Sequence, residues 1–292
     1  MKIYFQGDKI EHPSCCIALG NFDGVHIGHL AILNAAKEAG KSFGALLFKN
    51  HTHNSTVITP LEDKIEILKD IGADFVYVVN FDNEFKSKSV AEFIEFLKYI
   101  GVEYISVGYD YRCGKGASAD SYMLKETAEK SGIITIITDA VLYKGSPVKS
   151  TNIRELIKSG DIEKANLMMY KPYTIKGSVV SGFQNGRKMG FPTANIEVKE
   201  NILLPADGVY YGRCVVNNKP YKVIINVGAN PTLNAKKRTV EGHIIGIKSD
   251  LYGRKLSYEF RGRIRKEMKF SSLDELKIQI EKDKYFAMEI NF

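Results

Sequence analysis

Two histidines, His26 and His29, lie three residues apart in a glycine-rich stretch, residues 20–29, that follows the apolar run 16–19. Residues 30–39 have helical periodicity, so the stretch is predicted to be the turn between a first strand and a first helix. Glycines let a backbone approach a ligand closely, and a helix start offers unpaired N–H groups to an anion. The pattern predicts that both imidazoles donate hydrogen bonds to a phosphate chain. The alternative is that they only cap the helix or lie on the surface.

A second glycine-rich segment, residues 107–116, follows a predicted strand and carries a carboxylate and cations. Asp110 and Arg112 in such a loop predict contact with a phosphate or with magnesium. A surface turn with solvated charges is the alternative for this segment.

Another helix is predicted to begin at residues 150–154. Ser150 or Thr151 would cap it, and the free N–H groups of its first turn would form an anion site with Arg154. Such a site would hold a phosphate chain. An ordinary capped helix with a solvated arginine is the alternative.

The second half contains a glycine-rich stretch, residues 177–195, that differs from a P-loop because it lacks Gly-x-x-x-x-Gly-Lys-Ser/Thr. Its amides are predicted to wrap a phosphate with a cation beside it, and the residues concerned are Gly182, Gly186, Arg187 and Gly190. Thr193 and Asn195 lie two residues apart, on one face of an extended segment. Their neutral oxygens, together with ATP phosphates, suit Mg²⁺, which prefers oxygen ligands and keeps several waters.

Short apolar runs alternate with amphipathic segments up to about residue 167, which predicts an α/β domain with a parallel sheet. The runs predicted as strands are residues 42–48, 75–79, 104–107 and 133–138. Helical periodicity is found in residues 61–71, after Pro60, and in residues 90–100. We therefore expect a Rossmann-like domain over residues 1–170, with ligands at the carboxyl ends of its strands.

The pattern changes near residues 170–173, and residues 171–292 are predicted to form an antiparallel β-barrel closed by a C-terminal helix. Short β-rich runs separated by Gly, Asn and Pro turns are found at residues 174–181, 209–217, 221–227, 239–247 and 255–260. The closing helix has Leu273, Leu276 and Ile280 on one face.

Composition narrows the class of protein. The 292 residues are enough for two domains, and 44% hydrophobic with 26% charged residues is typical of a soluble globular chain. No run approaches the roughly 20 apolar residues of a membrane span, and the N-terminus lacks a secretory signal, so we expect a cytoplasmic protein without a membrane partner.

The four cysteines have no Cys-x-x-Cys spacing. A net charge of +7 fits an anionic partner, but the basic groups lack the interleaved aromatics of a nucleic-acid platform, so no nucleic acid is expected.

These motifs resemble those of the bacterial riboflavin kinase/FAD synthetase family. Residues 20–29 match its Gly-x-Phe-Asp-Gly-x-His-x-Gly-His motif, residues 108–114 partly match its second loop, and residues 150–154 match its Ser-Ser-Thr-x-Ile-Arg segment. Residues 177–195 match the riboflavin kinase signature that ends in Pro-Thr-Ala-Asn. The later kinase elements are resembled, in chain order, by residues 208–210, 226–232, 240–244, 251–253 and 263–270.

The resemblance implies a Rossmann-like nucleotidyltransferase domain that adenylylates FMN and a barrel domain that phosphorylates riboflavin. Riboflavin, FMN, FAD and ATP would be its ligands, with Mg²⁺ accompanying ATP, while the oligomeric state stays open. His26 and His29 would contact the phosphates, and Glu241 would be the catalytic base that a primary alcohol needs when it attacks a phosphate. The remaining residues that the resemblance assigns to substrate or nucleotide are Gly20, Asn21, Asp23, Asp110, Arg112, Ser150, Thr151, Arg154, Gly182, Arg187, Gly190, Tyr252, Arg265 and Phe270.

This chain departs from the family pattern at several places. Residues 48–52 lack both prolines of the usual Phe-x-Pro-His-Pro, and Lys149 replaces a serine. Tyr109, Tyr111 and Cys113 replace the usual aromatics around Asp110, and residues 245–248 replace a usual Leu-Asp-Phe. Two alternatives therefore stay open: that only one activity is retained, with adenylyl transfer the one lost, or that the chain is a flavin- or nucleotide-binding regulator without turnover.

Overall fold

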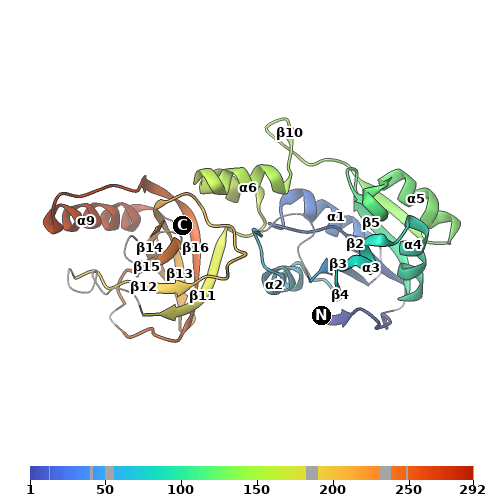
Figure 1. Cartoon of the computed structure of the whole chain (residues 1–292), viewed down its shortest axis with the longest axis horizontal. Helices are drawn as coiled ribbons and strands as arrows, with labels where there is room; N and C mark the ends of the chain where they lie inside the picture. Colours follow the sequence, from blue (N-terminus) through green and yellow to red (C-terminus); the bar gives the residue numbers. More distant parts are fainter. Residues whose placement is uncertain are drawn as a thin grey trace. The chain divides into compact units, whose positions relative to one another are not determined.

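The computed structural model describes residues 1–12, 14–39, 42–49, 56–181, 190–229, 238–247 and 249–291. Their packing divides the chain into two compact units, Met1–Ser150 and Thr151–Phe292 (Figure 1). The division precedes the boundary predicted near residues 170–173, because the two helices after Ser150 group with the second unit. The boundary at 170/171 stays a prediction about the two functional domains.

The first unit is built on a six-stranded parallel sheet in the order β1-β4-β3-β2-β5-β8. Its strands are β1 (Lys2–Phe5), β2 (Cys15–Leu19), β3 (Phe43–Phe48), β4 (Phe75–Val79), β5 (Val102–Gly108) and β8 (Ile134–Thr138). Every residue of β2 and β4 is buried, as expected for a parallel sheet covered on both faces. The α/β prediction is confirmed.

Helices cover both faces of this sheet, and the two apolar clusters show which helix packs on which face. Leu33 of α1 (Ile27–Glu38) and Leu68 of α2 (Leu61–Ile71) belong to one cluster. The other contains residues of α3 (Asn83–Ser87), α4 (Val90–Tyr99) and α5 (Ser121–Lys130). Short pairs complete the unit: β6 (Arg112–Cys113) with β7 (Ala119–Asp120), around the 3-10 helix η1 (Lys115–Ala117), and β9 (Leu142–Tyr143) with β10 (Ser146–Pro147). The sheet is therefore doubly wound.

The second unit contains a closed antiparallel barrel in the order β11-β12-β15-β14-β13-β16. Its strands are β11 (Thr174–Val180), β12 (Ala194–Glu197), β13 (Gly208–Val216), β14 (Lys219–Ala229), β15 (Arg238–Ile244) and β16 (Lys255–Lys266). The aromatic rings of Tyr173, Tyr210, Tyr258 and Phe260 are fully buried. The predicted barrel is confirmed.

In the part of the chain that the structure describes, the helices that accompany the barrel are α6 (Ser150–Ser159), α7 (Ile162–Met168) and α9 (Leu273–Glu289). Figure 1 shows α9 running beside the barrel, where Ala287 packs with Val209 and Ile224. No helix in the described part of the chain is long and apolar enough to cross a membrane.

The apolar face predicted for α9 is only partly covered by the barrel. Leu276 and Ile280 are half-buried, whereas Leu273 is 70% exposed. The buried residues of the helix are Asp283 and Ala287, which continue the same stripe at helical spacing. The later turns of α9 therefore pack against the barrel, and Leu273, the first residue of the stripe, is exposed to solvent.

Candidate active sites

His26 and His29 cap helix α1 with each other's side chains. His26 is the N-cap residue, and its Nδ1 accepts a hydrogen bond of 3.2 Å from the backbone N–H of His29. His29 Nδ1 in turn accepts one of 3.3 Å from the backbone N–H of His26. The two rings lie stacked, with centroids 3.6 Å apart. The pair thus forms a capping box, which is the capping role that the sequence left open.

The cap determines which nitrogen of each imidazole carries a proton. Burial lowers the pKa of His26 to about 4, although Asp110 opposes the shift. Burial, His26 and Lys64 hold the pKa of His29 well below its usual value. Both rings are therefore neutral at pH 7, and because each Nδ1 accepts a hydrogen bond, each Nε2 carries the proton. The cap leaves two Nε2–H donors at a helix start, which is what binding of a phosphate chain requires.

The turn before α1 has an unusual backbone. Phe22 and Val25 have φ of 49° and 34°, values rare for residues other than glycine and rarer for a β-branched one. Gly28 has ordinary φ, but a Cβ there would lie 3.1 Å from the His26 ring. The glycine of His-x-Gly-His therefore makes room for the imidazole that caps the helix.

Asp23 ties this turn to two other segments. Its buried carboxylate accepts hydrogen bonds from the backbone N–H groups of Ile58 (2.9 Å) and Thr59 (3.1 Å). Its carbonyl oxygen accepts one of 2.8 Å from the hydroxyl of Ser150. Two predicted site residues, Asp23 and Ser150, are thus in contact, while Asn21 is exposed.

Lys64 is a residue of this site that the sequence reasoning missed. It lies on α2, is only 5% exposed, and its Nζ donates a hydrogen bond of 2.7 Å to the carbonyl oxygen of Asn21. A signal was available, because Lys64 falls on the apolar stripe of Leu61 and Leu68, where a lysine is out of place.

The predicted loop after β5 contains an ion pair that involves one of the departures from the family pattern. Lys149 Nζ lies 2.8 Å from a carboxylate oxygen of Asp110, and both side chains are about half exposed. Lys149 also lies over the Tyr109 ring, 5.6 Å from its centroid. Hydrogen bonding to Asp110 raises the pKa of Lys149. Arg112 is used within its own loop, where it donates to the Ala117 carbonyl at 3.2 Å.

The remaining predicted residues of the first site are described by their exposure and by the space around them. Thr151 is exposed at the start of α6, whereas Arg154, one turn later, is buried. A Cβ at Gly20 would lie 3.2 Å from the Phe22 ring. Residues 50–52 of the altered segment lie outside the described residues, as do Gly182 and Arg187 of the second site.

The strand register of the barrel brings the predicted kinase residues together. Glu241 on β15 lies directly opposite Asn195 on β12 and, on its other side, directly opposite Asn226 on β14. Residues paired in this way have their side chains on the same face of a sheet. Burial raises the pKa of Glu241, so its carboxylate takes up a proton more readily than an exposed glutamate does. A candidate base thus lies beside a candidate metal ligand.

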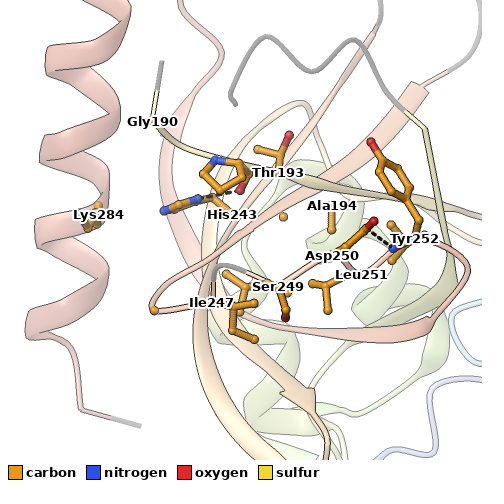
Figure 2. Close-up of a pocket in the computed structure, with 15 residues that line it drawn as sticks. Gly190, Thr193, Ala194, His243, Ile247, Ser249, Asp250, Leu251, Tyr252 and Lys284 are labelled. Atoms are coloured by element: carbon orange, nitrogen blue, oxygen red, sulfur yellow. Dashed lines mark hydrogen bonds between the residues drawn. The ribbon is translucent and has the colours of Figure 1, made fainter. Parts of the chain in front are cut away.

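A pocket of about 490 Å³ (Figure 2) is lined by Ala194 and Gly242, the chain neighbours of Asn195 and Glu241. Three predicted residues line it: Gly190, Thr193 and Tyr252. His243, two residues after Glu241, is on the side toward α9, and its Nδ1 lies 2.9 Å from the Pro192 carbonyl oxygen. Because a carbonyl only accepts, Nδ1 must carry the proton. The contact holds β15 against the segment that bears Thr193.

Arg265 and Phe270, two of the residues predicted to contact substrate or nucleotide, lie against each other. The Arg265 guanidinium is 5.7 Å from the Phe270 ring centroid. It also forms a bidentate pair with Asp283 of α9, with Nη2 to Oδ2 at 2.9 Å and Nε to Oδ1 at 3.1 Å. Gln279 donates to the same carboxylate at 2.8 Å. Arg265 therefore fastens α9 to the barrel.

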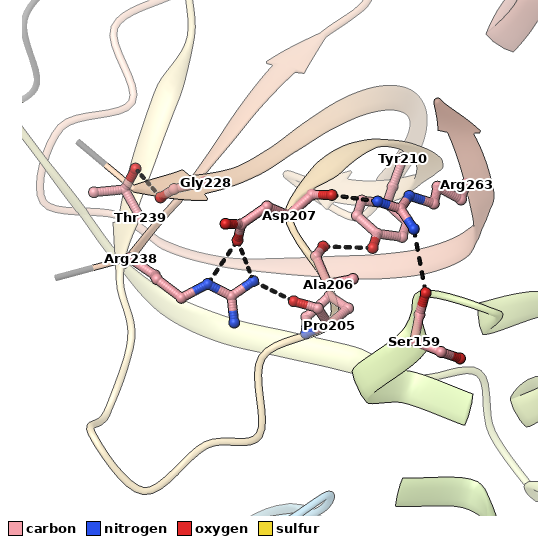
Figure 3. Close-up of polar contacts among 9 residues, drawn as sticks. All are labelled: Ser159, Pro205, Ala206, Asp207, Tyr210, Gly228, Arg238, Thr239 and Arg263. Atoms are coloured by element: carbon pink, nitrogen blue, oxygen red, sulfur yellow. Dashed lines mark hydrogen bonds and ion pairs between the residues drawn. The ribbon is translucent and has the colours of Figure 1, made fainter. Parts of the chain in front are cut away.

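Asp207 anchors β15, the strand that carries Glu241 (Figure 3). It holds the first residue of that strand. Its carboxylate accepts a hydrogen bond of 2.7 Å from Nε of Arg238, the first residue of β15. Its carbonyl oxygen accepts a hydrogen bond from Arg263, which also donates to the Ser159 carbonyl at 3.2 Å. The start of β15 is thus connected to the end of α6.

Neutral imidazole donors at one site and a half-buried carboxylate beside side-chain oxygens at the other are groups suited to the transfer of phosphorus-containing groups. Comparison with family models matches residues 8–152 to FAD synthetase and residues 169–291 to riboflavin kinase. A bifunctional riboflavin kinase/FMN adenylyltransferase of Bacillus subtilis is 33% identical, over 96% of this chain and 93% of its own length. One of Listeria monocytogenes is 34% identical, over 91% and 89%. The chain belongs to the bifunctional riboflavin kinase/FMN adenylyltransferase family.

A solved structure supports the fold over the whole length. A crystal structure from Streptococcus pneumoniae, described as a macrolide-efflux protein, superposes with a TM-score of 0.90 at 25% identity and covers all of both chains.

Proposed function

We propose that this chain makes both flavin cofactors: it phosphorylates riboflavin to FMN in the barrel unit, and it adenylylates FMN to FAD in the α/β unit. Membership of the family supports both steps. The observation that carries the kinase step is the register that sets Glu241 opposite Asn195. ATP is the donor in both steps, and we propose that they occur in the cytoplasm.

In the kinase step, Glu241 accepts the proton of the ribityl 5′-hydroxyl as that oxygen attacks the γ-phosphorus of ATP. The new P–O bond forms as the bond to the β-phosphate oxygen breaks, and ADP leaves. Burial helps the base, because it raises the pKa of Glu241 toward the working pH. The hydroxyl would otherwise be a weak nucleophile.

The residues present fit Mg²⁺ accompanying ATP. Thr193 is exposed and Asn195 half-buried, so their side-chain oxygens would be available to a hydrated ion. Groups of three or more His, Cys, Asp or Glu suited to a metal are absent from the described residues. Mg²⁺ held largely by ATP phosphates and water does not need such a group, and when bound it would neutralise phosphate charge.

In the adenylyl step, a phosphate oxygen of FMN attacks the α-phosphorus of ATP, and the bond to the β-phosphate breaks to release pyrophosphate. The nucleophile is already anionic, so the protein must position the groups and neutralise charge rather than remove a proton. The Nε2–H groups of His26 and His29 would donate to the phosphates. Arg154 would hold the leaving pyrophosphate.

Chromatography of the products tests the proposal. The purified chain is incubated with riboflavin, ATP and Mg²⁺, and separately with FMN in place of riboflavin. FMN and FAD from the first mixture, with FAD from the second, are expected. FMN without FAD from either mixture would leave a kinase alone, and tight FMN binding without any product would mean a regulator.

A further inference from the structure

Lys64 is a buried cation that contacts the turn before α1, residues 20–26, which leads to the two histidines. Its side chain comes from the first turn of α2, is 5% exposed, and donates to the carbonyl oxygen of Asn21 at 2.7 Å. Asn21 directly precedes Phe22, where the backbone takes a positive φ. The hydrogen bond therefore fixes the residue at which the strained turn begins.

The charges around Lys64 show why an ammonium is tolerated there. Burial lowers the pKa of Lys64, and the neighbouring carboxylate of Asp23 opposes the shift. That carboxylate is itself held by the backbone N–H groups of Ile58 and Thr59. Burying a lysine costs free energy unless its ammonium group is paired or hydrogen-bonded. The position of Lys64 next to the turn therefore needs an explanation.

The positive charge of Lys64 also acts on His29, where it helps to keep the imidazole neutral. A neutral imidazole contributes a hydrogen-bond donor but no full charge, and the same holds for His26. A triphosphate that gives up pyrophosphate needs positive charge as well as donors. Lys64 adds that charge at the turn where the two Nε2–H donors begin the helix.

We propose that Lys64 is a positioning residue for adenylyl transfer: it fixes the Asn21 carbonyl, and with it the turn, and it adds positive charge beneath the phosphate site. The inference rests on the proposed FMN adenylylation and on the assignment of His26 and His29 to the phosphates. It assigns Lys64 a part in the adenylyl step and none in the kinase step.

The test compares three variants by steady-state kinetics of FMN adenylylation. Lys64→Met keeps the length of the side chain and removes its charge, Lys64→Arg keeps the charge, and Lys69→Met is a control on an exposed position of the same helix. We expect Lys64→Met to lower kcat/KM for ATP about 10- to 100-fold, the range for a lost hydrogen bond to a charged group. Lys64→Arg should restore most of that loss, and Lys69→Met should match the parent.

Two internal measurements separate this role from a purely structural one. Riboflavin phosphorylation by the same preparation should be unchanged in every variant, and adenylylation is assayed well below each melting temperature. If Lys64→Met adenylylates FMN within twofold of the parent, the inference is wrong. It is also wrong if the rate falls only in proportion to the folded fraction, or if folded Lys64→Arg is as slow as Lys64→Met. If the parent itself makes no FAD, the proposed function fails instead.

Discussion

Asn195 and Glu241 lie directly opposite each other on β12 and β15, although 45 residues of sequence separate them. The barrel therefore brings a side chain with a neutral oxygen next to a half-buried carboxylate, and its register, rather than any local motif, makes the candidate kinase site. Asn226 continues the same row on β14.

Glu241→Gln should make the barrel more stable at neutral pH. Burial raises the pKa of Glu241, so keeping it ionised disfavours the folded state. A raised carboxyl pKa contributes stability below the unfolded-state pKa, and this contribution is lost as pH rises through the folded-state pKa. Glutamine has no such ionisation. Melting temperatures of parent and variant at pH 4 and pH 8 check this, and a variant less stable than the parent at pH 8 would contradict it.

We expect the first unit to lose stability in acid, because His26 caps α1 as a buried neutral imidazole. The pKa of His26 is about 4, below the unfolded value of about 6.5. Protonation therefore favours unfolding, and stability present above pH 6.5 is lost as pH falls toward 4, by on the order of 3 kcal/mol. Denaturant unfolding of the first unit against pH measures the loss. His26→Asn, which keeps a capping side chain, should flatten the curve, and an equally steep curve would refute the assignment.

Gly28→Ala should impair adenylyl transfer without affecting phosphorylation. Alanine in place of glycine ordinarily stabilises a helix by about 1 kcal/mol. Here the added Cβ would lie 3.1 Å from the His26 ring, so the imidazole would have to move. We expect the rate of FAD formation from FMN to fall about tenfold, because misplacing a positioned group is costly. FAD formation at the parent rate would show that the ring position is unimportant.

Asp283→Asn should loosen α9 from the barrel. Asp283 is 3% exposed and pairs with Arg265, whose guanidinium would be left without its counter-charge. Breaking such a pair costs about 3 kcal/mol or more. Urea unfolding of the second unit measures the loss, and Asp274→Asn, at an exposed position of the same helix, serves as the control. Equal stability of the two variants would show that the pair contributes little.

Local patterns predicted the elements well where periodicity was strong. The helix at residues 61–71 and the strand at residues 75–79 were predicted with the bounds that the structure has. β1 was not predicted, because four residues at a sheet edge, of which only Tyr4 is buried, give no clear alternation. The predicted stripe of α9 was right in spacing, but its extent depends on where the barrel ends, which is tertiary information.

Among the site residues too, local contacts could be predicted from the sequence and contacts between distant segments could not. The cap formed by His26 and His29 could be foreseen because it is local, and the sequence left it open as an alternative. The contact of Ser150 with Asp23 and the contact of Lys64 with Asn21 join distant segments, so no local pattern specifies them. A lysine on an apolar stripe is the sequence signal that would have directed attention to Lys64.

The central claim is that one chain holds two separate sites. We would measure FMN formation from riboflavin and FAD formation from FMN for Glu241→Gln and for His29→Ala. We predict that Glu241→Gln lowers only the first rate, by about 100-fold or more, as for loss of a general base. His29→Ala should lower only the second. If either folded variant lost both activities or kept both at the parent rate, the account would be contradicted.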